Sequence, residues 1–221
     1  LASALRRMEV PVDERAQVVG LELSAGECMV TLASGESVRA GRVVIATGAW
    51  SGALDWLPEG ERPPVRPVKG EILTLRSRDG EPACERILGG ERVYLVPRED
   101  GRLVVGATME ERGFATAVTA GGVHELLREA YRVLPEIAEM EMVSARAGLR
   151  PGTPDNAPVI GHGANERLVI ATGHHRNGIL LAPVTAEAVT ALLEGSEPPG
   201  DLTPFSPHRF AGAERPQVAL R

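Results

Sequence analysis

The chain has 221 residues, of which 43% are hydrophobic and 24% charged, and its formal net charge at pH 7 is −6. These values predict a globular protein of one large or two small domains. The negative charge argues against nucleic acid as a partner. No apolar run is long enough to cross a bilayer, so we expect no membrane partner. Cys28 and Cys84 form no CxxC pattern, which favours a cytoplasmic protein without disulfides or a metal site.

The first part of the chain predicts a small β-meander over residues 17–45 that leads into a buried strand. The segments QVVGLEL and CMVTLA are strand-like, and SAGE between them is turn-forming. The apolar run 43–46 ends at a Thr-Gly pair, which is typical of a parallel strand buried on both faces. Residues 58–70 are rich in Pro and charge, and they predict a crossing between two lobes.

The middle of the chain predicts an antiparallel sheet and one helix. The strand EILTLRS precedes the hairpin YLVPREDGRLVVGAT, in which EDG forms the turn. Apolar residues keep the helical period over residues 122–134. The segment MVSARAGLRPG predicts a further strand that runs into a turn.

The last part repeats the pattern of a buried strand followed by Thr-Gly, in RLVIATG. Residues 178–194 then predict a helix that stops at Gly195 and holds Pro183 near its first turn. Glycine after a strand end lets a ligand approach the backbone, so two such ends favour a ligand site over plain αβ packing. The cations of GHHRNG precede a helix N-terminus that is already positive, which favours an electron-rich ligand there.

Six segments in chain order resemble a known family. They are RVVIATGAWSG, PVKGEIL, YLVPREDGRLVVGATM, GLRPGTPDNAPVIG, ATGHHRNGILLAPVTAEAV and DLTPFSPHRF. From about residue 16 to residue 210 the chain is similar to the D-amino-acid-oxidase-like flavoproteins, and among them to the glycine oxidases of thiamine biosynthesis. GLRPGTPD and GHHRNGILLAP are the most specific parts.

The resemblance implies a fold of mixed α/β and α+β class. A partial FAD-binding, Rossmann-like lobe would comprise residues 1–52 and 153–200. An antiparallel-sheet substrate lobe would comprise residues 53–152, and residues 201–221 would form a C-terminal tail whose last residues are loosely held.

The resemblance also implies the substrate contacts. Arg150 would grip the substrate carboxylate, because a guanidinium fork makes two parallel hydrogen bonds to it. The Tyr94 hydroxyl would bond the same carboxylate, and Met109 would narrow the pocket over the amine. Arg176 would border both flavin and substrate. No residue is expected to act as a catalytic acid or base.

The implied FAD contacts lie at strand ends and in the loop before the last helix. They are Val18, Thr47, Gly48, Gly173, His175, Arg176, Asn177, Gly178, Ile179 and Leu180. Gly148 stands where sarcosine-oxidase-like relatives hold a cysteine bonded to the flavin, so FAD is expected to bind non-covalently.

The implied reaction is oxidative deamination of glycine or another small amino acid to an imine and then an oxo acid, with hydrogen peroxide, for thiamine biosynthesis. A D-amino-acid or sarcosine-type oxidoreductase and an inactive fragment without flavin remain alternatives. The GxGxxG that opens the family's FAD lobe occurs nowhere in the sequence. The chain is therefore expected to be the later part of a longer enzyme that takes a small amino acid and forms a homo-oligomer.

Overall fold

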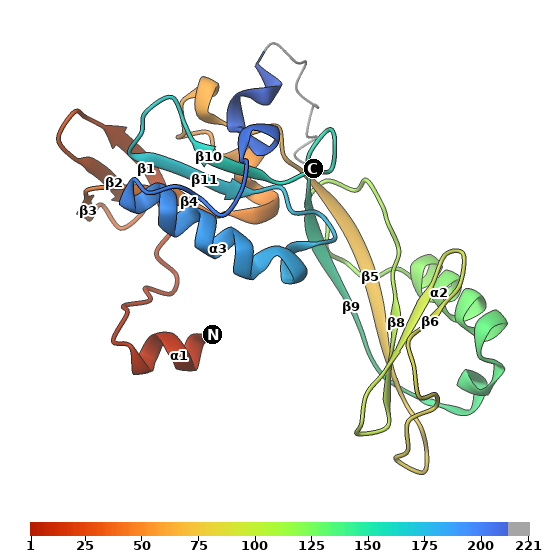
Figure 1. Ribbon diagram of the computed structural model, residues 1–221. Helices are drawn as coiled ribbons and strands as arrows, with labels where there is room; N and C mark the ends of the chain where they lie inside the picture. Colours follow the sequence, from red (N-terminus) through yellow and green to blue (C-terminus); the bar gives the residue numbers. More distant parts are fainter. Residues whose placement is uncertain (212–221) are drawn as a thin grey trace.

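A computed structural model describes residues 1–211. Residues 212–221 of the expected tail lie outside the described residues. The strands form three sheets, two of three strands and one of five. Figure 1 shows the two smaller sheets at one end of the molecule and the long five-stranded sheet at the other. The short 3-10 helices are η1 (Gly48–Ala53), η2 (Glu59–Glu61), η3 (Pro135–Glu139), η4 (Thr203–Phe205) and η5 (Pro207–Phe210).

The first sheet is the expected antiparallel meander. It consists of β1 (Val18–Leu23), β2 (Cys28–Leu32) and β3 (Ser37–Ala40), paired in chain order. The short helix α1 (Ala2–Arg7) precedes it, has no buried residue and was not expected from the sequence. The turn segment SAGE joins β1 to β2, as the sequence predicts.

The second sheet brings the two strand–Thr-Gly segments side by side. Its order is β10 (Val159–His162), β11 (Leu168–Thr172) and β4 (Val43–Ile45). Strands β4 and β11 run parallel, so both Thr-Gly pairs follow the same edge. The expectation that the first of these strands is buried on both faces is wrong, because Val44 is 37% exposed. In this sheet β4 is an edge strand with one neighbour.

Helix α3 (Gly178–Glu194) has the bounds that the sequence predicts, and it packs against β10 and β11. Gly195 ends it in the left-handed conformation, with φ of 72°. The expected place of Pro183 is wrong, because it is the sixth helical residue and lies in the second turn. An N–H at that position would have bonded to the carbonyl of Ile179, so the helix lacks one of its internal hydrogen bonds there.

The third sheet has the order β6-β7-β8-β5-β9 and is antiparallel throughout. Its two long strands, β5 (Arg66–Arg76) and β9 (Glu141–Gly152), pair over almost their whole length. The expected crossing over residues 58–70 is too long, because residues 66–70 already belong to the sheet. Pro67 is tolerated there because it pairs with Pro151, beyond the segment that β8 covers. The strands are β5 (Arg66–Arg76), β6 (Leu88–Gly89), β7 (Tyr94–Pro97), β8 (Arg102–Gly106) and β9 (Glu141–Gly152).

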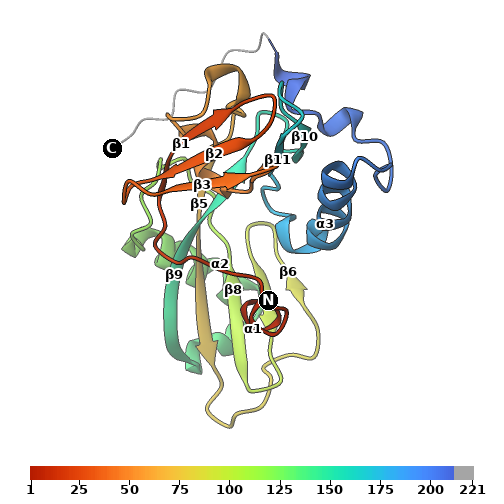
Figure 2. The ribbon, with the colours of Figure 1, turned by 90° about the vertical axis from the view of Figure 1, so that its left-hand side faces the viewer.

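Helix α2 (Ala120–Val133) covers one face of this sheet, within two residues of the bounds expected from the sequence. In Figure 1 it lies to the right of the sheet and α3 to the left, and Figure 2 shows the same parts turned by 90°. The core between α2 and the sheet consists of apolar side chains. They are Leu73, Leu75, Val93, Leu95, Leu103, Val105, Leu126, Ala130 and Ile137. Because side chains alternate along a strand, residues between these positions face the side of the sheet opposite α2.

Candidate active site

A cavity of about 700 Å³ lies where the segments 89–94 and 107–109 meet the end of β9 and the loop before α3. It brings together the four residues that the family resemblance implies as substrate contacts. They are Tyr94, Met109, Arg150 and Arg176. These four side chains come from separate segments of the chain, so their convergence is a product of the fold.

A second cavity of about 710 Å³ lies between the two smaller sheets and is lined by polar residues. Two of its charged groups, those of Glu61 and Arg167, already have protein partners. The Glu61 carboxylate accepts the N–H of Ala164 at 2.8 Å. The Arg167 guanidinium donates to the carbonyl oxygens of Gly41 and Ala25. The first cavity is the stronger candidate because it gathers all four proposed substrate contacts, two of which are arginines.

Arg150 comes from β9, and its guanidinium is half-buried. Its Nη1 donates to the carbonyl oxygen of Thr108 at 3.1 Å and to that of Lys69 at 3.4 Å. Burial lowers the pKa of Arg150, the nearby Tyr94 raises it and the positive charge of Arg176 lowers it. Within residues 1–211, no carboxylate lies within 4.0 Å of either arginine's guanidinium. The two guanidinium groups make the cavity suited to an anion.

Two glycines make room for the side chains of Arg150 and Tyr94. A Cβ atom on Gly70 would lie 2.2 Å from Nη1 of Arg150, and one on Gly106 would lie 2.5 Å from the Tyr94 hydroxyl oxygen. Both side chains therefore lie against the backbone of a neighbouring strand. Any larger residue at either glycine would push them from these positions.

The loop before α3 is fixed against the end of β9. The N–H of His175 donates to the carbonyl oxygen of Pro151 at 3.0 Å, which places Arg176 beside the same cavity as Arg150. Burial lowers the pKa of His175, and the charges of Arg150 and Arg176 lower it further. We therefore expect a neutral His175 imidazole at pH 7, so the positive charge of this loop comes from Arg176.

The two Thr-Gly pairs meet at a residue that the sequence did not single out, Ser51. Its hydroxyl is buried and lies 2.9 Å from that of Thr47 and 2.8 Å from that of Thr172. It also donates to the carbonyl oxygen of Gly48 at 2.8 Å. Gly48 and Gly173 both have positive φ, at 56° and 77°, which glycine adopts without strain. Ser51 thus joins the two strand ends where backbone can approach a ligand.

The remaining proposed FAD contacts do not lie together at one place. Asn177 is the N-cap of α3 but makes no side-chain capping bond. Ile179 and Leu180 follow Gly178 in the first turn and are 94% and 78% exposed. Val18 lies in β1, in a different sheet from the strand ends, and lines neither of the two cavities.

A buried ion pair lies beside the cavity, and the sequence reasoning missed it. Lys69 and Glu71 are 2% and 0% exposed, and Lys69 Nζ lies 2.6 Å from Glu71 Oε1. Burial acts to raise the pKa of Glu71, but the bonds from Lys69 and Thr119 outweigh it and hold that pKa below its ordinary value. The only sequence signal was a pair of opposite charges two residues apart in PVKGEIL, on one face of a strand.

The family model described as FAD dependent oxidoreductase, the DAO family, matches residues 1–192. The chain belongs to this family. The expected family and fold class are therefore confirmed. Among the described residues, no helix is both long and apolar enough to cross a membrane.

Curated relatives are similar over most of this chain. A glycine oxidase of Bacillus licheniformis is 43% identical over 196 residues, which cover 88% of this chain and 52% of that protein. A bifunctional ThiO/ThiG protein of Synechocystis sp. is 38% identical over 225 residues, which cover 99% of this chain and 33% of that protein. The chain thus spans about half or less of the length of these relatives.

Solved structures show the same fold. The crystal structure of glycine oxidase from Geobacillus kaustophilus superposes with a TM-score of 0.83 at 36% identity, over 90% of this chain and 53% of that one. The crystal structure of iminodiacetate oxidase from Chelativorans sp. has a TM-score of 0.82 at 28% identity, over 93% of this chain and 57% of that one.

Proposed function

We propose that the protein containing this chain uses FAD to oxidise glycine or another small amino acid. The amine would become an imine, water would convert the imine to an oxo acid and ammonia, and O₂ would be reduced to hydrogen peroxide. The observation that carries the proposal is a pair of arginines, Arg150 and Arg176, that face one cavity without a carboxylate partner in the described chain. The resemblance to glycine oxidases supports it.

The residues of the chain fit a flavin beside the cavity. A Cβ atom on Gly148 would meet nothing within 4 Å, so there is open space over β9 two residues from Arg150. A glycine offers no atom for a covalent link, which supports non-covalent FAD. When bound, FAD accepts a hydride from the substrate Cα. We propose that the FAD lobe comprises residues 1–52 and 153–200 and the substrate lobe residues 53–152.

The proposed FAD contacts all belong to the strand ends, the loop before α3 and its first turn, with one residue in β1. They are Val18, Thr47, Gly48, Gly173, His175, Arg176, Asn177, Gly178, Ile179 and Leu180.

In this proposal the protein binds and orients the substrate rather than exchanging protons with it. The Arg150 fork holds the carboxylate by two charge-assisted hydrogen bonds, and the Tyr94 hydroxyl donates a third. Met109 limits the space over the amine. Arg176 and the N-terminus of α3 add positive potential, which favours an anionic flavin. A substrate that enters as the free amine needs no strong base at Cα.

The identity of the amine is the finer part of the proposal. The similarity to ThiO/ThiG proteins supports a role in thiamine biosynthesis, and the similarity to iminodiacetate oxidase keeps N-substituted glycines open. Peroxide release with glycine, sarcosine, D-alanine and iminodiacetate would separate these substrates. We also propose a cytoplasmic, homo-oligomeric enzyme. A purified protein without a flavin absorption band would instead favour a non-catalytic role.

The decisive experiment compares Arg150→Ala and Arg150→Lys with the unchanged enzyme, using the FAD-loaded product of the full gene. We expect kcat/KM for glycine to fall about ten- to a hundredfold in the alanine variant, because a charge-assisted pair contributes roughly 1.5–3 kcal/mol. Arg150→Lys should recover only part of this, since it keeps the charge without the fork.

Two controls make the test specific to the carboxylate. Ethylamine, which has no carboxylate, should lose far less activity than glycine in both Arg150 variants. Arg146→Ala alters an exposed arginine on the same face of β9, outside the cavity, and should change neither substrate's kcat/KM. Equal losses for glycine and ethylamine would show that Arg150 supports the fold instead of the substrate.

A further inference from the structure

Main-chain oxygens hold the Arg150 guanidinium in place, and they use only one of its nitrogens. Nη1 donates to the carbonyl oxygens of Thr108 and Lys69, whereas Nε and Nη2 have no protein acceptor within residues 1–211. A carbonyl oxygen orients a guanidinium without neutralising its charge. The other edge of the fork therefore keeps both its donors and its charge for a carboxylate.

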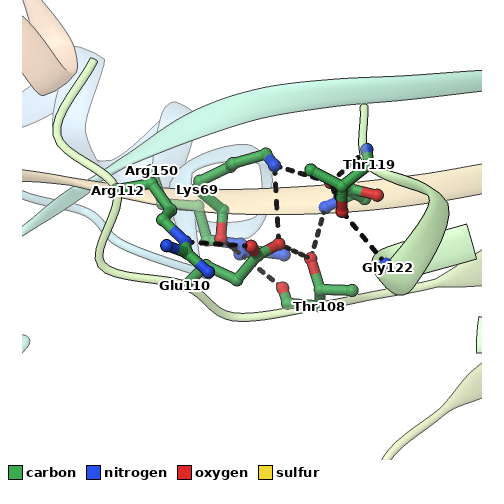
Figure 3. A network of polar contacts seen from close by, with 8 residues as sticks. Lys69, Thr108, Glu110, Arg112, Thr119, Gly122 and Arg150 are labelled. Carbon is green, nitrogen blue, oxygen red and sulfur yellow. Dashed lines mark hydrogen bonds and ion pairs between the residues drawn. The ribbon is translucent and has the colours of Figure 1, made fainter. Parts of the chain in front are cut away.

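Both of these carbonyl oxygens belong to residues of a buried polar network, drawn in Figure 3. Lys69 Nζ is paired with Glu71 at 2.6 Å and lies 3.6 Å from Glu110 Oε1. The main chains of Lys69 and Glu110 also exchange two hydrogen bonds, at 2.9 and 3.0 Å. The carbonyl oxygen of Lys69 that faces Arg150 is thus also held by the N–H of Glu110.

Thr108 links this network to the cavity. Its N–H donates to the carbonyl oxygen of Glu71 at 3.2 Å, and its hydroxyl accepts the N–H of Glu71 at 2.8 Å. The same hydroxyl donates to Glu110 Oε1 at 2.8 Å. Three bonds hold a residue that is 8% exposed, so its carbonyl cannot turn away from Arg150 without breaking buried bonds.

The network is anchored on its far side to α2. Glu71 Oε1 accepts the N–H and the hydroxyl of Thr119, the N-cap of α2, at 3.0 and 3.1 Å. The Thr119 hydroxyl accepts the N–H of Gly122 at 3.0 Å (Figure 3). Glu71, which bonds Thr108 through its main chain, is therefore held through its side chain by the N-terminus of the helix.

We propose that Thr108 is a positioning residue for the substrate carboxylate. Its hydroxyl, held between Glu71 and Glu110, aims its carbonyl oxygen at Arg150 and so fixes the angle of the guanidinium fork. This inference rests on the carboxylate-binding role proposed for Arg150. Loosening Thr108 should weaken carboxylate binding and leave the groups proposed to hold FAD unchanged.

The test uses Thr108→Val, which removes the hydroxyl at nearly constant volume, and Thr108→Ser, which keeps it. The probe is glycolate, the analogue of glycine with a hydroxyl in place of the amine, and its Kd is read from the flavin absorption of the FAD-loaded protein. We expect Thr108→Val to raise this Kd about three- to tenfold, the effect of a lost hydrogen bond. Thr108→Ser should stay within about twofold.

Thr74→Val is the matched control, because Thr74 is a half-buried β5 threonine whose side chain makes no hydrogen bond within the described chain. Its glycolate Kd should not change. In turnover, Thr108→Val should raise KM for glycine more than it lowers kcat and should leave ethylamine oxidation unchanged. A merely structural role of Thr108 would affect both substrates alike.

Several outcomes would overturn the inference. A glycolate Kd within twofold of the unchanged protein in Thr108→Val would do so, as would a Thr108→Ser variant as weak as the valine variant. If Thr108→Val does not fold, Glu110→Ala replaces it. That variant removes the acceptor of the hydroxyl, and we expect a rise in Kd of about two- to threefold. An unchanged Kd in Glu110→Ala would then overturn the inference.

The Arg150→Ala variant separates this inference from the proposed function. If Arg150→Ala leaves the glycolate Kd unchanged, the proposed carboxylate site is wrong. If Arg150→Ala weakens glycolate binding and Thr108→Val does not, only the positioning role is wrong. If glycolate binding behaves as expected but no amino acid is oxidised, the positioning role stands and the proposed reaction is wrong.

Discussion

The five-stranded sheet and the three-stranded β10-β11-β4 sheet cover their apolar surfaces to different degrees. Beneath α2, the larger sheet closes a core in which Leu73 and Leu95 are fully buried. Helix α3, by contrast, is apolar on nearly every side, a pattern typical of a helix buried all round. Yet only Ala188 and Ala191 of this helix are buried, and Ile179 is 94% exposed.

This difference separates the two halves of the candidate site. Arg150, Tyr94 and the Thr108 network belong to the well-packed sheet, which supports them through its own core. The proposed FAD contacts belong to strand ends and to a helix whose first turn exposes large apolar side chains. The smaller sheet has a buried core of its own, which includes Val159, Leu168 and Ile170. The contrast in stability should therefore lie between the two buried cores and the exposed first turn of α3 and edge strand β4.

The largest expected effect is at the buried ion pair. Glu71→Ala removes the nearer carboxylate of the buried Lys69 ammonium and leaves only Glu110, whose Oε1 lies 3.6 Å away. Breaking a buried pair costs about 3–5 kcal/mol. We expect that loss in the free energy of unfolding, measured by urea denaturation with circular dichroism. Glu187→Ala, at an exposed position of α3, should change it by less than about 0.5 kcal/mol. A loss below about 1 kcal/mol in Glu71→Ala would mean that Lys69 finds another partner or water.

The second prediction compares apolar side chains in the two sheets. Leu95→Ala removes a side chain with no exposed surface from the larger core, and we expect a loss of about 2–5 kcal/mol. Val44→Ala, in the edge strand of the smaller sheet, should cost less than about 1 kcal/mol, because its side chain already meets solvent. Similar losses in the two variants would remove the contrast between the covered core and the exposed edge strand.

These two regions also show what the sequence could and could not predict. Local periodicity and turn residues predict the 178–194 helix and the hairpin of β7 and β8. Both lie in the structure where the sequence predicts them. β10 was missed because it is four residues long and follows a Pro-rich turn. Periodicity also does not show which strands become neighbours. The contact of both Thr-Gly pairs with Ser51 could therefore not be predicted from the local sequence.

Within the candidate site, the proposed substrate contacts were predicted and the residues that support them were not. The resemblance to a family supplied Tyr94, Met109, Arg150 and Arg176, which the fold gathers around one cavity. Lys69 and Glu71, which support these residues, were not predicted, because a lysine and a glutamate in a strand indicate a solvent-exposed face. Here that face lies under α2, and only tertiary structure shows that the charges compensate each other. Supporting networks of this kind are set by packing rather than by motifs.

The third prediction concerns the ion pair between Asp155 and Arg209 of η5, the short helix that contacts β10 of the smaller sheet. Hydrogen bonds from Arg209 lower the pKa of Asp155 from 3.8 to about 2. A depressed carboxyl pKa stabilises the fold above the unfolded pKa, and the effect is lost as the pH falls through about 2. The Asp155 side chain is 44% exposed, so solvent screening leaves a contribution of about 1 kcal/mol.

Asp155→Asn should therefore lower the free energy of unfolding by about 1 kcal/mol at pH 6. The difference from the unchanged chain should shrink as the pH falls from about 4 and should be lost only below about 2, where the Asp155 carboxyl of the folded chain is protonated as well. Urea denaturation at a series of pH values measures this difference. A gap that stays constant down to pH 2 would show that the asparagine acts through geometry and not through charge.

The smallest expected effect is at the first turn of α3. Leu180 is 78% exposed, so Leu180→Ser removes little buried surface and should change the free energy of unfolding of this chain by less than about 0.5 kcal/mol. The comparison is with Leu181→Ser next to it, which alters a half-buried leucine on the same helix and should cost more. A loss of about 2 kcal/mol or more in Leu180→Ser would mean that the first turn is covered in solution. The contrast between the two regions would then disappear at the helix that is proposed to face the flavin.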